Sequence, residues 1–180
     1  TIEVEGRPIG VAFTPDGSRV YVANSESNSV SVIDTATNTV TATIAVGAFP
    51  QGLAFTPNGS SAYVGSSFSN SVSVIDTATN TVVDTINIGR DSTAVAITPD
   101  GSRAYLTSTG TGAVSVIDTA TNTVIATIGI GGAPVGVAIT PDGSRAYVAN
   151  NSIASVSWPS PRMDLVPTCR IIPPPLAPSR

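Results

Sequence analysis

An internal repeat of 42 residues runs through most of this 180-residue chain and constrains its fold more than any other feature. The turn sequence TPDGS or TPNGS begins at Thr14, Thr56, Thr98 and Thr140. One tyrosine per unit keeps the same spacing, at Tyr21, Tyr63, Tyr105 and Tyr147. Because independent positions agree on one register, the chain is built from repeated structural units of equal size.

Each unit is expected to contain four short β-strands. In the first unit these are Val11–Thr14, Arg19–Asn24, Ser29–Thr35 and Thr39–Val46, all rich in Val, Ile, Thr or Tyr. Between the first two, Pro15 and Asp16 suit a tight turn, and Gly17 is predicted to adopt a positive φ, as are Gly59, Gly101 and Gly143. No helical period of useful length is present, so the fold class is all-β.

Some of these strands are apolar on both faces, as at Val32–Ile33, so their sheet needs cover on both sides. Identical sheets stacked radially supply that cover. We therefore predict a β-propeller of four-stranded antiparallel blades with a 42-residue repeat. A β-helix is the alternative, but its rungs are shorter and lack two hairpin turns per unit.

The unit GVAFTPDGSRVYVANSESNSVSVIDTATNTVTATIAVG resembles the YVTN repeats of β-propellers in archaeal and bacterial surface-layer and other cell-surface proteins. The YVTN tetrapeptide that gives the family its name reads YVAN at Tyr21–Asn24 and Tyr147–Asn150. It is replaced by YVGS at Tyr63–Ser66 and by YLTS at Tyr105–Ser108. The resemblance covers about residues 1–157. It implies a propeller fold and an extracellular or cell-surface location, but no particular chemistry.

The repeats divide into units at about 7–46, 47–88, 89–130 and 131–157, and residues 1–6 match the last strand of a unit. If that first segment pairs into the last blade, a four-bladed ring results. The alternative, which we favour because the resemblance implies more blades, is part of a larger ring. The chain starts at Thr1, so we expect its natural start, and any signal peptide, to lie outside this sequence.

Residues 158–180 form an anomalous Pro-rich tail that breaks the repeat at Trp158. Shifted by two bases, the codons of WPSPRMDLVPTC can spell AITPDGSRAYV, which is Ala138–Val148 of this chain. We infer that the tail is a further blade read in the wrong frame. We expect it to be disordered, with no role for Met163 or Cys169.

Charge and composition narrow the function classes. Only 11% of residues are charged, the net charge is −4 and histidine is absent. These values argue against nucleic acid as a partner, and no apolar run is long enough for membrane insertion.

The sequence also lacks the residues that a propeller enzyme would need. Without histidine no Ser–His pair can form, and the first-strand segments, such as VAFT, carry no charge. We therefore expect no enzyme activity and no cofactor. The rival interpretation is a lactonase-like or dehydrogenase-like propeller enzyme.

Asp34, Asp76 and Asp118 recur in the IDTATN turn and raise the question of a calcium site. Calcium needs six or more oxygen ligands, usually from several carboxylates, whereas each turn offers one. We favour an Asx-type turn in which the carboxylate accepts backbone N–H groups, with Asn38, Asn80 and Asn122 in the left-handed region. The sequence therefore predicts no metal site.

One face of the disc is expected to vary between blades, because its loops differ while the TPDGS and DTATNT turns opposite stay uniform. Variation can reflect drift, or it can fit an asymmetric partner. Candidate binding residues on this face are Arg7, Glu26, Phe49, Gln51, Phe68, Arg90 and Asp91. The expected function is a non-catalytic scaffold or binding module of a cell-surface or secreted protein, whose partner is a protein or a cell-envelope component.

Overall fold

The computed structural model describes residues 1–151 and 168–172 of this chain, and every regular element in them is a β-strand. The first blade consists of β1 (Pro8–Phe13), β2 (Arg19–Asn24), β3 (Ser29–Asp34) and β4 (Thr39–Ala45). The second consists of β5 (Pro50–Phe55), β6 (Ser61–Ser66), β7 (Ser71–Asp76) and β8 (Thr81–Asn87). The third consists of β9 (Ser92–Ile97), β10 (Arg103–Ser108), β11 (Ala113–Asp118) and β12 (Thr123–Gly129). A last sheet contains β13 (Pro134–Ile139), β14 (Ala146–Asn150) and β15 (Thr168–Ile172).

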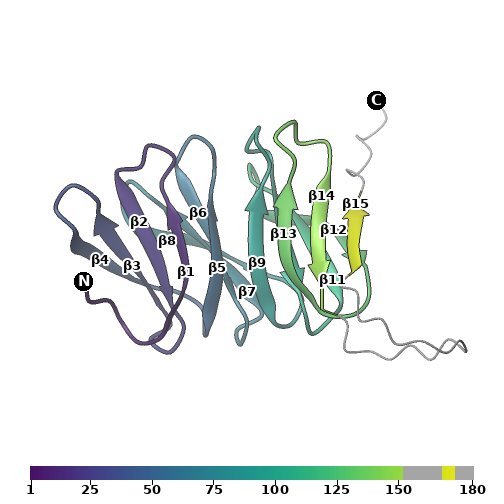
Figure 1. Cartoon of the computed structure of the whole chain (residues 1–180), viewed down its shortest axis with the longest axis horizontal. Helices are drawn as coiled ribbons and strands as arrows, with labels where there is room; N and C mark the ends of the chain where they lie inside the picture. The colour runs from purple at the N-terminus through teal and green to yellow at the C-terminus, as the bar shows by residue number, and fades with distance from the viewer. Residues whose placement is uncertain (152–167, 173–180) are drawn as a thin grey trace, which may run out of the picture.

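Within each blade the strands pair antiparallel in sequence order, which confirms the predicted propeller blade. The register also repeats: Tyr21 lies opposite Val32 in β3, and Tyr63 opposite Val74 in β7. The sheets follow one another along an arc, and β1, β5, β9 and β13 lie side by side on its inner edge (Figure 1). The described residues contain no helix long and apolar enough to cross a membrane.

The hydrophobic core lies between the blades. Tyr21, Val30 and Val32 of the first blade pack against Val64 and Ile75 of the second, and all five side chains are almost fully buried. The same packing recurs at the next two junctions. In the second and third blades, the third strands β7 and β11 are covered on both faces by neighbouring sheets, as their apolar sequences require.

Polar contacts join the first blade to the second and the second blade to the third. The Tyr21 hydroxyl donates to Oδ1 of Asn80 at 2.7 Å, and the Tyr63 hydroxyl donates to Oδ1 of Asn122 at 2.6 Å. Nη1 of Arg19 donates to the carbonyl oxygen of Thr77 at 2.9 Å. Burial raises the pKa of Tyr63 to about 12, so its hydroxyl stays protonated and able to donate. We call this tyrosine–asparagine pair the interblade latch.

The turns opposite the variable loops follow the sequence prediction. Gly17, Gly59, Gly101 and Gly143 have φ of 71°, 72°, 74° and 69°. Asn38, Asn80 and Asn122 have φ of 55°, 55° and 53°. Oδ1 of Asp34 accepts the N–H groups of Ala36 at 3.0 Å and Thr37 at 2.8 Å, the pattern of an Asx-type turn. The TATN turn therefore shapes its own hairpin and also receives the latch.

The two ends of the chain bear on the four-bladed alternative and on the expected disorder of the tail. Residues 1–6 form no strand, so the pairing of Ile2–Val4 with the last sheet, which a four-bladed ring requires, does not occur. Figure 1 shows the first blade and the last sheet at opposite ends of the arc. The third strand of the last sheet is β15, which pairs with β14 and lies in the tail where we expected disorder. Cys169 lies in β15, opposite Ala149 of β14. Met163 and the rest of the tail, 158–167 and 173–180, lie outside the described residues, as do 152–157 of the last unit.

The latch makes a prediction about stability. Tyr63→Phe removes the donor to Asn122 and should lower the free energy of unfolding by about 1 kcal/mol, measured by urea denaturation. Tyr105→Phe is the matched control, because the Tyr105 hydroxyl has no hydrogen-bond partner among the described residues. Equal losses in the two variants would contradict a contribution from the latch.

Acid should weaken the fold through the TPDGS turns. Hydrogen bonds from threonine and serine lower the pKa of Asp16, Asp100 and Asp142 from 3.8 to about 2. Because the carboxylates are more acidic in the folded state, their stabilisation is present above pH 4 and is lost as the pH falls toward 2. Denaturation between pH 7 and pH 2 measures this loss. Replacing all three with asparagine, the residue present at Asn58, should make the loss shallower, and an unchanged slope would contradict the assignment.

Candidate functional site

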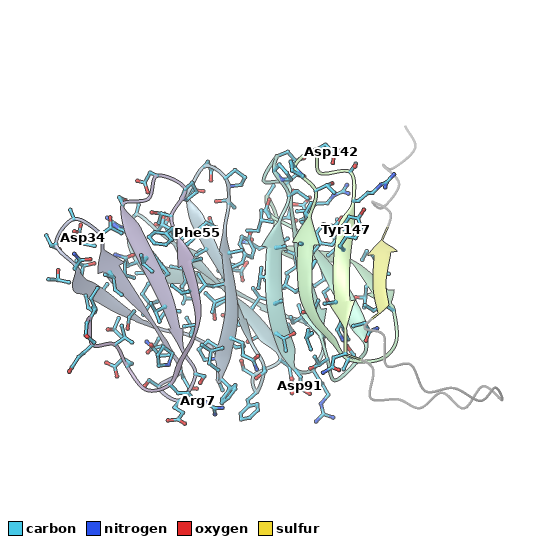
Figure 2. All side chains as sticks on the ribbon, in the orientation of Figure 1. Arg7, Asp34, Phe55, Asp91, Asp142 and Tyr147 are labelled. Atoms are coloured by element: carbon cyan, nitrogen blue, oxygen red, sulfur yellow. The ribbon has the colours of Figure 1, made fainter. Side chains whose placement is uncertain are left out.

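The links between blades and the loops between second and third strands meet on one face of the molecule. The Ser25 N–H donates to the carbonyl oxygen of Arg7 at 2.9 Å, and the Phe68 N–H donates to that of Ala48 at 3.1 Å. We call this the variable face; its loops are residues 25–28, 67–70 and 109–112, and its links are residues 46–49, 88–91 and 130–133, with Gly6 and Arg7 before β1. Figure 2 places Arg7 and Asp91 at this edge, opposite Asp34 and Asp142.

Three links hold a non-glycine residue in the left-handed region at the same place. Arg7, Phe49 and Asp91 have φ of 53°, 58° and 57°. Side chains other than glycine rarely adopt this conformation, which costs on the order of 1 kcal/mol. An asparagine holds two of these three links: Oδ1 of Asn28 accepts the Phe49 N–H at 2.9 Å, and Oδ1 of Asn70 accepts the Asp91 N–H at 3.4 Å. The links are therefore fixed in shape.

Four of the predicted residues come together in one row on this face. Nη1 of Arg7 lies 4.0 Å from Oε1 of Glu26, and the Arg7 guanidinium carbon lies 5.4 Å from the centroid of the Phe49 ring. The Phe49 ring stacks on Phe68 with centroids 4.6 Å apart and planes at 19°. We call Glu26, Arg7, Phe49 and Phe68 the aromatic row. It joins the first blade to the second, although its members lie on separate loops.

The contacts in the aromatic row differ in strength. The Arg7 and Glu26 side chains are 57% and 65% exposed, so their ion pair contributes little. Stacking of Phe49 on Phe68 and the cation–π contact of Arg7 each contribute about 0.5–1 kcal/mol. Phe68 is nevertheless 70% exposed. The row therefore presents a large apolar ring that its neighbours hold in place.

The other predicted residues lie beside the row. Nε2 of Gln51 donates to Oγ of Ser67 at 3.2 Å, and Ser67 precedes Phe68 in the same loop. Arg90 and Asp91 lie in the next link, where their carbonyl oxygens accept N–H groups from the loop at 109–112. The structure thus groups Gln51 with the aromatic row and separates Arg90 and Asp91 from it.

Sequence reasoning missed Asn28 and Asn70, whose side chains accept the backbone N–H groups of the links at Phe49 and Asp91. A signal was available, because both asparagines follow the 42-residue period and have φ of 53° and 54°, while Gly112 occupies the third position with φ of 60°. Asparagine or glycine at the same loop position in successive units indicates a left-handed conformation there. The two amides position the backbone of Phe49 and Asp91.

The inner strands, the acidic residues and the largest hollow described below give no arrangement of catalytic or metal-binding side chains among the described residues. The inner strands β1, β5, β9 and β13 read PIGVAF, PQGLAF, STAVAI and PVGVAI and contain no charged side chain. Among residues 1–151 and 168–172 no three His, Cys, Asp or Glu side chains gather where they could hold a metal ion. A hollow of about 510 Å³ between the first two TPDGS-type turns is lined by Asp16 and Arg19, among others, but Asp16 is already hydrogen-bonded within its turn.

The fold is similar to that of known structures. Hydrazine synthase from Kuenenia stuttgartiensis matches with a TM-score of 0.81 and 30% identity, over 87% of this chain and 45% of that one. A functionally unknown protein from Desulfotomaculum acetoxidans DSM 771 matches with a TM-score of 0.70 and 19% identity, over 79% of this chain and 49% of that one. This chain therefore spans about half the length of these two proteins.

Comparison with curated proteins gave no match. The family model described as the YNCE-like β-propeller matches residues 7–100, which is more than half of the 180-residue chain. That match agrees with the 42-residue repeat, the four-stranded blades and the resemblance to YVTN repeats. The chain belongs to the YNCE-like β-propeller family.

Proposed function

We propose that this chain is a non-catalytic binding module of a cell-surface or secreted protein, and that it binds its partner through the variable face. The observation that carries the proposal is the exposed ring of Phe68, which is stacked on Phe49 and bordered by Arg7. Exposed aromatic and arginine side chains are the residues that most often anchor protein interfaces. The partner is a protein or another component of the cell envelope.

Rigidity of the links supports this role. Asn28 fixes the left-handed link that carries Phe49, so the aromatic row loses little conformational freedom when a partner binds. Loops held by a rigid scaffold are also where binding residues concentrate. Drift would make these loops vary too, but it does not account for four side chains from separate loops in one row.

The alternative is an enzyme, since one similar structure is a hydrazine synthase. We propose that this chain is not catalytic, because its sequence has no histidine and its inner strands carry no charged side chain that could act as acid or base. The resemblance to surface-layer repeats supports an extracellular or cell-surface location. The repeats contain no cysteine, which is compatible with export.

Binding to isolated cell envelopes of the producing organism tests the proposal. The labelled full chain should be retained, and Phe68→Ala should weaken retention about tenfold, the size expected when an interface anchor is truncated. Ile125→Ala is a matched control, because Ile125 is 48% exposed on β12, away from the aromatic row. Equal retention of the Phe68→Ala and Ile125→Ala variants would refute a role for the variable face.

A further inference from the structure

The turn between β5 and β6 carries a sequence that the corresponding turns of the other units lack. Asparagine stands at position 58 where the other three units have aspartate, so this turn reads Asn58–Gly59–Ser60. Asn-X-Ser, where X is not proline, is the acceptor sequence, or sequon, for N-linked oligosaccharides on secreted proteins. The exchange of one aspartate for asparagine therefore turns a structural turn into a candidate modification site.

Asn58 is exposed, and the turn orients its amide. Oδ1 accepts hydrogen bonds from the Thr56 hydroxyl at 2.7 Å, from the Ser60 N–H at 3.1 Å and from the Ser60 hydroxyl at 2.9 Å. Because a backbone N–H can only donate, the atom that faces Ser60 must be the oxygen of the amide. Nδ2, the nitrogen that would carry the sugar, makes no hydrogen bond to any described residue. The acceptor nitrogen is thus free while the amide oxygen is held in place.

A second sequon, Asn150–Asn151–Ser152, offers a comparison within the same chain, although Ser152 lies outside the described residues. Asn150 ends β14, and its amide is occupied at both atoms. Nδ2 donates to the carbonyl oxygen of Gly131 at 2.6 Å, and Oδ1 accepts the Ala133 N–H at 2.8 Å. A sugar on this nitrogen would compete with the hydrogen bonds that join β14 to the link at 130–133. Of the two sequons, the one at Asn58 has the available nitrogen.

We propose that Asn58 is the attachment site of an N-linked oligosaccharide, an inference that rests on the proposed cell-surface or secreted location. The co-reactant is an oligosaccharide carried on a lipid phosphate or diphosphate. Nδ2 of Asn58 forms a bond to C1 of the first sugar as the bond from C1 to the phosphate oxygen breaks. The lipid phosphate leaves with that electron pair, and Nδ2 gives up one proton to a base of the transferase.

The position of Asn58 fits a bulky polar group. Asn58 borders the hollow between the first two TPDGS-type turns, and that hollow is open to solvent beside Ser18 and Arg19. Figure 2 shows Asp142, the counterpart of Asn58 in the last sheet, at the edge opposite Arg7 of the variable face. An oligosaccharide on Asn58 therefore leaves the variable face free for its partner and keeps the opposite face turned toward solvent.

Mass spectrometry of the full chain, recovered from the cell surface and the culture medium of the producing organism, tests the proposal. Trypsin cleaves after arginine and places the two sequons in separate fragments, residues 20–90 and 146–162. The 20–90 fragment should carry the mass of an oligosaccharide. Asn58→Asp removes the acceptor nitrogen and Ser60→Ala removes the hydroxyl that the sequon requires, so each should abolish that mass, whereas Ser60→Thr should keep it. Ser18→Ala, at the matching position of the first unit, is the control and should also keep it.

The fractions and variants separate this inference from the proposed function. An unmodified 20–90 fragment in protein recovered from the cell surface would overturn the inference and leave the proposed function standing. Recovery of the chain only from inside the cell would contradict the proposed location and the inference with it. An oligosaccharide that persists in Ser60→Ala, or that lies on the 146–162 fragment instead, would also overturn the assignment to Asn58. Asn58→Asp restores the turn sequence of the other units, so it should fold, and urea denaturation checks this.

Discussion

Packing of sheet against sheet is the constraint on which the rest of this structure depends. The third strand of each blade is apolar on both sides: in the second blade Val74 and Ile75 are 2% and 0% exposed although they point to opposite faces. A single blade of four short strands can cover neither face by itself. Neighbouring sheets with the same pattern cover both, and the arc of blades follows directly from that requirement.

Because the core lies between the sheets, the two faces of the molecule that carry the turns and loops can differ in role. At one edge the TPDGS and TATN turns repeat, and they are occupied with internal hydrogen bonds such as those of Asp34 and the latch on Asn80. At the other edge, links and loops touch each other mainly through backbone groups, as Ser25 and Arg7 do. Side chains can therefore change there without disturbing the core, and the aromatic row lies on this edge.

The repeat made the strands, the turn glycines and the grouping of loops on two edges predictable from sequence. Contacts between blades were not predictable in the same way. Tyr21 and Asn80 are 59 positions apart, and only the angle between sheets brings them together. Likewise, Phe49 and Phe68 come from a link and a loop, and their rings meet where the link at Phe49 adopts the left-handed conformation. Residues 1–6 match a strand in sequence but form none, because a strand needs a paired neighbour that sequence similarity alone does not identify.

The order of the latch along the chain has a consequence for synthesis. Tyr21 leaves the ribosome well before Asn80, and Tyr63 before Asn122, so a finished blade has no latch until the following unit has emerged. Assembly is therefore directional, because each new hairpin secures the sheet made before it. During translation the most recent blade therefore lacks its latch, and near-identical repeats that are not yet secured are the ones open to mispairing with their neighbours.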